Sequence, residues 1–271
     1  MGIRVELKGP ENQVLEVEGG TWHLLADREA SPEELPDPFL GPVDWVRFGS
    51  RFEELTVVFV PSDPAVGLPC QAFRSLFSGF ELFRVETPEG DLLLTDDFRT
   101  AGHGGGRRKP SAPSLLDFLL FQYPAGNDTF LPGVSRLGPG ESLSVHPAEP
   151  GRPVFGQAEK LRMPPKVSPH EAMERSREAL SAAVGKAIEG VPDAAVLFSG
   201  GIDSTLVRLF AGNRAIALHA GIDTPELAYE EDYAEAVCRG KGTSLVRALF
   251  SEEDFLEDME ESCRKLGRPF P

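Results

Sequence analysis

The stretch DAAVLFSGGIDSTLVRLFAG, residues 193–212, runs from one apolar segment through two glycines into a second apolar segment, with no proline between them. Residues 194–199 predict a buried strand, and residues 203–211, closed by Gly212, predict a helix. The turn at 199–204 can point successive backbone N–H groups into one concavity, because glycine accepts positive φ and lets an anion approach closely. The helix N-terminus adds partial positive charge. The turn therefore predicts an anion site, although a tight strand-to-helix turn without a ligand has a similar pattern.

The sequence around this turn alternates between strands and helices. Ser168, Pro169 and Glu171 form an N-terminal capping signature, which predicts a helix to about Ile188. The apolar positions that line one face of this helix are Met173, Leu180, Val184, Ala187 and Ile188. Strands are then predicted at 215–221 and 244–250, and helices at 225–240 and 252–266. This alternation predicts an α/β fold with a doubly wound parallel sheet, whose ligands lie beyond the carboxyl ends of the strands.

The first half of the chain has a different pattern, rich in β-structure. Strands are predicted at 3–9, 14–19 and 55–61, with a hairpin formed by 80–87 and 91–97 and a further strand at 141–147. Residues 99–114 are rich in glycine, basic residues and proline and predict a mobile surface loop, and 114–123 predict a deeply buried helix. Residues 148–167 lack periodicity and mark the boundary. We therefore expect an α+β domain over 1–160 and an α/β domain over 161–271.

Charge and cysteine content exclude several classes of protein. The chain of 271 residues has a formal net charge of −16, which repels polyanions and argues against nucleic acid or an anionic membrane as the main partner. Cys70, Cys238 and Cys263 are widely spaced and odd in number, so they predict neither a disulfide framework nor a zinc site. The chain shows no signal peptide and no apolar stretch that could span a membrane, so we expect a cytoplasmic protein.

The turn Ser-Gly-Gly-x-Asp-Ser resembles the pyrophosphate loop of the ATP pyrophosphatase (PP-loop) superfamily, and it lacks the Gly-Lys-Ser/Thr of a Walker A loop. A wider resemblance is to the asparagine synthetases. The segments that carry it are SLLDFLLFQYPAGNDTFLPGVSRLGPGESL at 114–143, VLFSGGIDSTLV at 196–207, LHAGID at 218–223 and GRPFP at 267–271. It covers residues 114–271 well and residues 1–113 loosely. Among the relatives of this family, β-lactam synthetases and lasso-peptide cyclases are similar in arrangement.

The resemblance implies a glutaminase-like (Ntn-type) β-sandwich followed by a synthetase domain that adenylates a carboxylate with ATP and Mg²⁺ and lets an amine attack it. It implies that Asp203 holds Mg²⁺ and that the pyrophosphate is held by Ser199, Gly200, Gly201, Asp203 and Ser204. It further implies that adenine contacts backbone atoms at Leu197 and from Leu218 to Ala220. His219 matches no ligand role and is expected to be a packing residue.

Two departures from the family bear on activity. The amidotransferase nucleophile is the cysteine after the initiator methionine, and Gly2 stands there, so we expect no glutamine hydrolysis. The second acidic magnesium motif of the family falls beyond Pro271, so we expect a C-terminal extension, a partner subunit or self-association to complete the synthetase domain. Two alternatives remain: a nucleotide-binding regulatory or scaffold subunit, and a PP-loop enzyme for sulfur transfer, which the lack of a C-x-x-C pair disfavours. The sequence identifies neither the acceptor carboxylate nor the amine.

Overall fold

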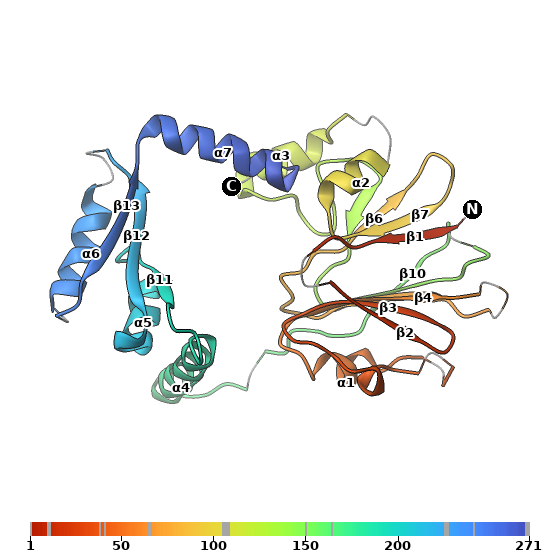
Figure 1. Cartoon of the computed structure of the whole chain (residues 1–271), viewed down its shortest axis with the longest axis horizontal. Helices are drawn as coiled ribbons and strands as arrows, with labels where there is room; N and C mark the ends of the chain where they lie inside the picture. The colour runs from red at the N-terminus through yellow and green to blue at the C-terminus, as the bar shows by residue number, and fades with distance from the viewer. Residues whose placement is uncertain are drawn as a thin grey trace. The chain divides into compact units, whose positions relative to one another are not determined.

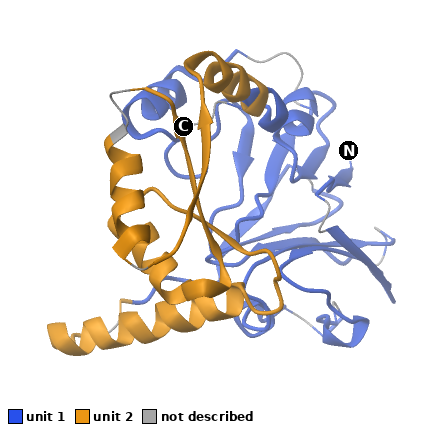
Figure 2. Ribbon diagram, turned by 60° about the vertical axis from the view of Figure 1, so that its left-hand side comes forward, with its two compact units in different colours: residues 1–162, 263–271 blue, residues 163–262 orange. Residues whose placement is uncertain are grey.

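The computed structural model describes residues 2–9, 12–37, 39–40, 42–63, 65, 67–104, 109–149, 151–163, 165–224, 228–240 and 242–268. The chain divides into two compact units, shown in different colours in Figure 2. The first unit comprises residues 1–162 together with 263–271, and the second comprises residues 163–262.

The first unit is built on two sheets. A four-stranded sheet has the order β1-β7-β6-β8, and a six-stranded sheet has the order β10-β9-β5-β4-β3-β2. The strands are β1 (Ile3–Glu6), β2 (Asn12–Val17), β3 (Gly20–Ala26), β4 (Leu55–Pro61), β5 (Cys70–Arg74), β6 (Phe83–Glu86), β7 (Leu92–Thr95), β8 (Val134–Arg136), β9 (Glu141–Val145) and β10 (Val154–Gln157). All pairings within these sheets are antiparallel except that of β1 with β7. The helices are η1 (Pro32–Glu34), α1 (Trp45–Gly49), α2 (Phe98–Gly104) and α3 (Ala112–Phe121).

The two sheets of the first unit lie in layers between α1 and α2 (Figure 1). Val58 of β4 and Leu94 of β7 belong to one core cluster, so the two sheets pack face to face. Val57 of β4 points the other way, into a cluster with Trp45 and Phe48 of α1. The opposite face of the four-stranded sheet packs against Phe98 and Ala101 of α2. The first unit therefore has a helix on each outer side of two packed sheets.

The second unit is a parallel sheet with helices between its strands. Its strands, in the spatial order β11-β12-β13, are β11 (Ala195–Leu197), β12 (Ile216–Ile222) and β13 (Leu245–Phe250). The helices are α4 (Pro169–Ala187), α5 (Ile202–Ala211), η3 (Gly212–Arg214), α6 (Ala228–Gly240) and α7 (Glu252–Leu266), which begins in this unit. The predicted capping of α4 is confirmed, because Oγ of Ser168 accepts a hydrogen bond from the backbone N–H of Glu171 at 3.1 Å.

Helices of the second unit pack against one face of this sheet, and the described residues of the unit leave the other face exposed. Val196, on one side of β11, packs with Val184 of α4 and Ala211 of α5, and Phe198, on the same side, packs with Ala234 of α6. The strand register places the following residues on the opposite face, where all are apolar and none is buried: Ala195, Leu197, Ile216, Leu218, Ala220, Ile222, Val246, Ala248 and Phe250. We refer to these nine residues as the open face.

Several expectations from the sequence need correction. The predicted buried helix at 114–123 forms as α3, but Leu119 is 79% exposed and of its residues only Ser114 is buried, because an apolar sequence does not by itself supply a covering layer. Part of the predicted mobile loop at 99–114 is helical: backbone N–H groups of Arg99 and Thr100 donate to the carboxylate of Asp97, and Phe98 anchors α2 in the core. The rest of that loop includes 105–108, which lie outside the described residues.

The strand order also limits the predicted winding. β11, β12 and β13 follow one another in sequence order, so this sheet winds in one direction over the described strands. A doubly wound sheet requires a reversal of that order, and the free edge of β11 is where such a reversal would add strands. The first three residues of the predicted helix at 225–240 lie outside the described residues.

We expect the substitution Phe59→Ala to lower the free energy of unfolding of the first unit by about 3–5 kcal/mol, because Phe59 is fully buried against Trp22, with ring centroids 4.9 Å apart. The matched control is Phe77→Ala, which removes the same ring from a side chain that is 74% exposed and should cost about 0.5 kcal/mol or less. Urea unfolding followed by tryptophan fluorescence reports on this unit, because Trp22 and Trp45 both lie in it. Equal losses for the two variants would contradict the described core.

Candidate functional site

The candidate site is the loop that joins β11 to α5. Gly201 is the N-cap of α5 and offers no side chain to the first-turn N–H groups. The first hydrogen bond of the helix joins the backbone N–H of Thr205 to the carbonyl of Gly201, at 2.9 Å. The backbone N–H groups that precede Thr205 in the first turn have no capping side chain. Unsatisfied donors at a helix N-terminus attract anions. The first turn of α5 therefore has no side-chain cap, as the predicted anion site requires.

Gly200 allows the loop to turn closely against α6. Its φ is +77°, a conformation that favours glycine. A Cβ at this position would lie 2.6 Å from the backbone nitrogen of Ala234 and 2.8 Å from Cβ of Tyr233. Both the backbone angle and the close approach of α6 therefore require glycine at position 200.

The two serines of the loop meet across it. Oγ of Ser199 and Oγ of Ser204 lie 3.2 Å apart, and Oγ of Ser204 donates to the carbonyl of Gly201 at 3.2 Å. The N–H of Gly201 is 3.4 Å from Oγ of Ser199. These contacts are long and involve exposed atoms, so a ligand oxygen could replace them at small cost. The structure therefore brings both predicted hydroxyl groups to the same loop as the N–H groups.

Asp203 lies in the first turn of α5 and is exposed. Its carboxylate has no partner among the residues that the structure describes. A carboxylate in this position stabilises the helix dipole, and it is also free to ligate a hard cation that binds phosphate oxygens. No group of three or more His, Cys, Asp or Glu side chains in the described part of the chain could hold a metal ion. A cation here would therefore depend on oxygen ligands from a bound molecule as well.

The three residues predicted near adenine lie on the open face. Leu197 is paired in register with Leu218, and Ala220 follows two residues further along β12. The carbonyl of Leu218 already accepts a hydrogen bond from the N–H of Phe198 at 2.8 Å. The side chain of Leu197 is 71% exposed, so an apolar surface adjoins the loop at the carboxyl end of the strands.

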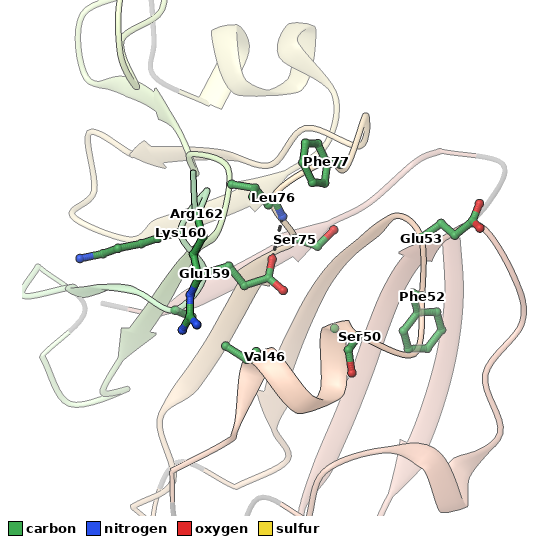
Figure 3. A pocket seen from close by; sticks show the side chains of 12 residues that line it. Val46, Ser50, Phe52, Glu53, Ser75, Leu76, Phe77, Glu159, Lys160 and Arg162 are labelled. Carbon is green, nitrogen blue, oxygen red and sulfur yellow. Dashed lines mark hydrogen bonds between the residues drawn. The ribbon is translucent and has the colours of Figure 1, made fainter. Parts of the chain in front are cut away.

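A separate cavity of about 450 Å³ lies in the first unit, beside α1 (Figure 3). Val46 and Phe77 form part of its wall, and the N–H of Leu76 donates to the carboxylate of Glu159 at 2.8 Å at its margin. None of the residues that the sequence singled out lines this cavity. The described residues that line it include no cysteine or histidine.

The parallel sheet, the loop and the helix that follows it form an α/β unit whose first strand-to-helix turn has no side-chain cap. The family model for asparagine synthase matches residues 175–270, which begin within α4 and include this loop. This part of the chain is therefore similar to the asparagine synthase family. No curated protein matches the chain. None of the described helices is long and apolar enough to cross a membrane.

Sequence reasoning missed a group of residues at the carboxyl end of β12. His219 is buried, as expected of a packing residue, but it also lines a cavity with Asp223 and Glu230. The alternation of side chains along 215–221 could have placed His219 on the covered face, opposite Leu218 and Ala220. It could not have shown that one ring nitrogen reaches a cavity.

We expect Gly200→Ala to destabilise the loop and its contact with α6 by about 1–3 kcal/mol more than Gly190→Ala does. Both glycines have positive φ, +77° and +72°, so both substitutions carry a similar backbone cost. A Cβ at Gly190 meets no atom within 4 Å, which makes this variant the matched control. Amide hydrogen exchange of α5 and α6 measures the difference. Equal exchange rates in the two variants would contradict the close contact described between Gly200 and α6.

Proposed function

We propose that the chain is an ATP-dependent amide-forming ligase of asparagine synthetase type, which adenylates a carboxylate, releases pyrophosphate and forms an amide with release of AMP. The observation that carries the proposal is the loop after β11, where uncapped N–H groups, two serine hydroxyls and a free carboxylate gather within the region that matches the family. Each of these groups suits a nucleotide triphosphate: donors for the phosphate oxygens and an anionic ligand for the accompanying cation.

The roles within the site follow from the chemistry of each group. The N–H groups of Gly200 and Gly201 and the hydroxyls of Ser199 and Ser204 would donate to the β- and γ-phosphates. Mg²⁺, when bound, would reduce the charge on these oxygens, with Asp203 as its protein ligand. The adenine ring would lie by Leu197, Leu218 and Ala220, where the open face offers apolar surface. Held this way, the α-phosphate is oriented for attack by a carboxylate.

We propose further that the chain does not hydrolyse glutamine. β1 and the residue before it carry no cysteine, serine or threonine. The only cysteine among residues 1–162 is Cys70, which is buried between the sheets, and burial raises the pKa of its thiol to about 12. A thiol with that pKa stays protonated and unreactive at neutral pH, because the thiolate is the nucleophile. Release of glutamate from glutamine by the purified chain would contradict this part of the proposal.

The open face supports the expectation that more polypeptide completes the synthetase domain, as a C-terminal extension, a partner subunit or a second copy. Nine apolar side chains lie on that face, and Leu197, Ile216, Val246 and Phe250 among them are 37–71% exposed. An uncovered apolar sheet face and a free strand edge are sites of association. A regulatory subunit that binds ATP without turnover would share these features. Pyrophosphate release with a carboxylate substrate distinguishes an enzyme from such a subunit.

We expect Asp203→Ala to weaken the binding of ATP with Mg²⁺ about ten- to hundredfold, because the loss of a contact to a charged group costs about 1.5–3 kcal/mol. Asp193→Ala is the control: Asp193 is also an exposed aspartate of the second unit, but it precedes β11 and lies outside the loop. Isothermal titration calorimetry gives both affinities. Equal binding by wild type, Asp203→Ala and Asp193→Ala would reject the assignment of the loop.

A further inference from the structure

A cavity of about 220 Å³ lies at the carboxyl end of β12, beside the first turn of α6. It is lined by His219, Asp223, Thr224, Glu230, Glu231 and Leu249, among others. We refer to it as the acidic pocket. His219 lies on the covered face and Ile222, which also lines the pocket, lies on the open face, so the acidic pocket is at the end of β12. Leu197, Leu218 and Ala220, the residues proposed to lie by adenine, do not line it.

The imidazole of His219 supplies a hydrogen-bond acceptor to this pocket. The residue is only 3% exposed, and Nδ1 lies 3.1 Å from the carbonyl oxygen of Phe198. A carbonyl can only accept, so Nδ1 carries a proton, and in the neutral form of an imidazole this leaves Nε2 as the acceptor. Nε2 has no partner among the described residues and is turned toward Gly221, where a Cβ would come within 3.0 Å of it. Nε2 is not one of the fully buried polar atoms that lack a partner, so it reaches the surface of the pocket, where a bound donor can contact it.

The carboxylates around Nε2 set the charge of the pocket. Glu231 forms an ion pair with Arg247, so the charge of Glu231 is compensated. The guanidinium group of Arg247 also lies 3.5 Å from the carboxylate of Glu235. The carboxylate of Asp223 has no partner in the described part of the chain, and that of Glu230 has only a distant contact, 3.5 Å from the hydroxyl of Tyr229. Among the described residues, no lysine or arginine lines the pocket. Two uncompensated carboxylates exceed the partial positive charge at the start of α6, which is about half a unit.

A cation that carries N–H groups matches both features. Its charge complements Asp223 and Glu230, and an N–H can donate to Nε2 of His219. A divalent metal fits less well, since no group of three ligating side chains occurs in the described residues. A neutral nucleobase fits less well, because it would leave the charges of the carboxylates uncompensated. A phosphate fits less well, because the carboxylates repel it. The volume suits a small group rather than a macromolecule.

We propose that the acidic pocket binds the primary ammonium group of a small amine, and that this amine is the nucleophile substrate of the ligase. One ammonium proton passes to Nε2 of His219 before attack, and a second N–H proton is lost to solvent as the amide forms and AMP leaves. The second half of the proposal rests on the proposed function. The first half stands on the geometry of the pocket alone: Asp223 and Glu230 hold the charge of the ammonium group, and Nε2 of His219 accepts one of its N–H groups. His219 is then a binding residue for the amine as well as part of the core.

The test is a titration of the full chain with n-propylammonium chloride in the absence of ATP. Binding is monitored through the NMR chemical shifts of the backbone amides of Gly221 and Thr224. A parallel titration uses N,N,N-trimethylpropylammonium, which has the same charge and no N–H. We expect saturable binding of the first compound and at least tenfold weaker binding of the second, because only the first donates a hydrogen bond to a buried acceptor.

The variant Asp223→Asn should weaken propylammonium binding about tenfold, since it removes one of two uncompensated charges. Asp223 is exposed, so the fold should tolerate the change. Asp232→Asn is the matched control: it makes the same change of charge on α6 at an exposed residue that does not line the pocket, and should alter affinity by less than about twofold. Equal binding of the two cations, equal effects of the two variants, or shifts that map away from Gly221 and Thr224 would each overturn the proposal.

Because ATP is absent from this titration, its outcome is independent of the nucleotide site. If the chain binds propylammonium but not ATP, the proposed amine pocket is supported and the proposed ligase function is rejected. ATP binding in a chain that fails to bind propylammonium would sustain the proposed function and reject the pocket.

Discussion

The proposed site of the second unit depends on the backbone N–H groups in the first turn of α5, which have no hydrogen-bond partner within that helix. β11 delivers the chain to Gly200 and Gly201, and α5 starts with a glycine N-cap that offers no oxygen to the first turn. In a chain with a formal net charge of −16, a phosphate is repelled at long range and can bind only where such local donors are concentrated. Gly200 makes this arrangement possible, because any larger residue would meet Ala234 and Tyr233 of α6.

The same sheet has two faces with different roles in this account. Its covered face packs against α4, α5 and α6 and ends at the acidic pocket, where His219 adds a buried acceptor to two uncompensated carboxylates. Its open face is apolar from β11 to β13 and suits both an adenine ring at the loop and further polypeptide beyond it. An amide-forming ligase must hold a polyanion and an amine at once. The account assigns the phosphates to the loop after β11 and the amine to the pocket at the end of β12, so the two ligands use different groups.

Local signals in the sequence predicted much of this unit. The cap at Ser168, the strand-glycine-helix pattern at 193–212 and the strands at 215–221 and 244–250 all depend on short-range periodicity and turn chemistry, and the structure confirms them. Burial was predicted less well, because it depends on neighbours far away in sequence. The apolar pattern of α3 predicted burial, yet Leu119 lies exposed, and the strands β3 and β5, both part of the sheet beneath α1, were not predicted. The tautomer and cavity of His219 depend on the carbonyl of Phe198 and on α6, which no local pattern specifies.

The central claim is that the backbone of the loop after β11 holds the phosphates of ATP. Amide hydrogen exchange of the full chain, measured with and without saturating ATP and Mg²⁺, tests it at the atoms concerned. The account predicts slower exchange in peptides that cover residues 199–205 and no change in peptides from α4 or from the two sheets of the first unit. Unchanged exchange at 199–205 under conditions where ATP is bound would contradict it.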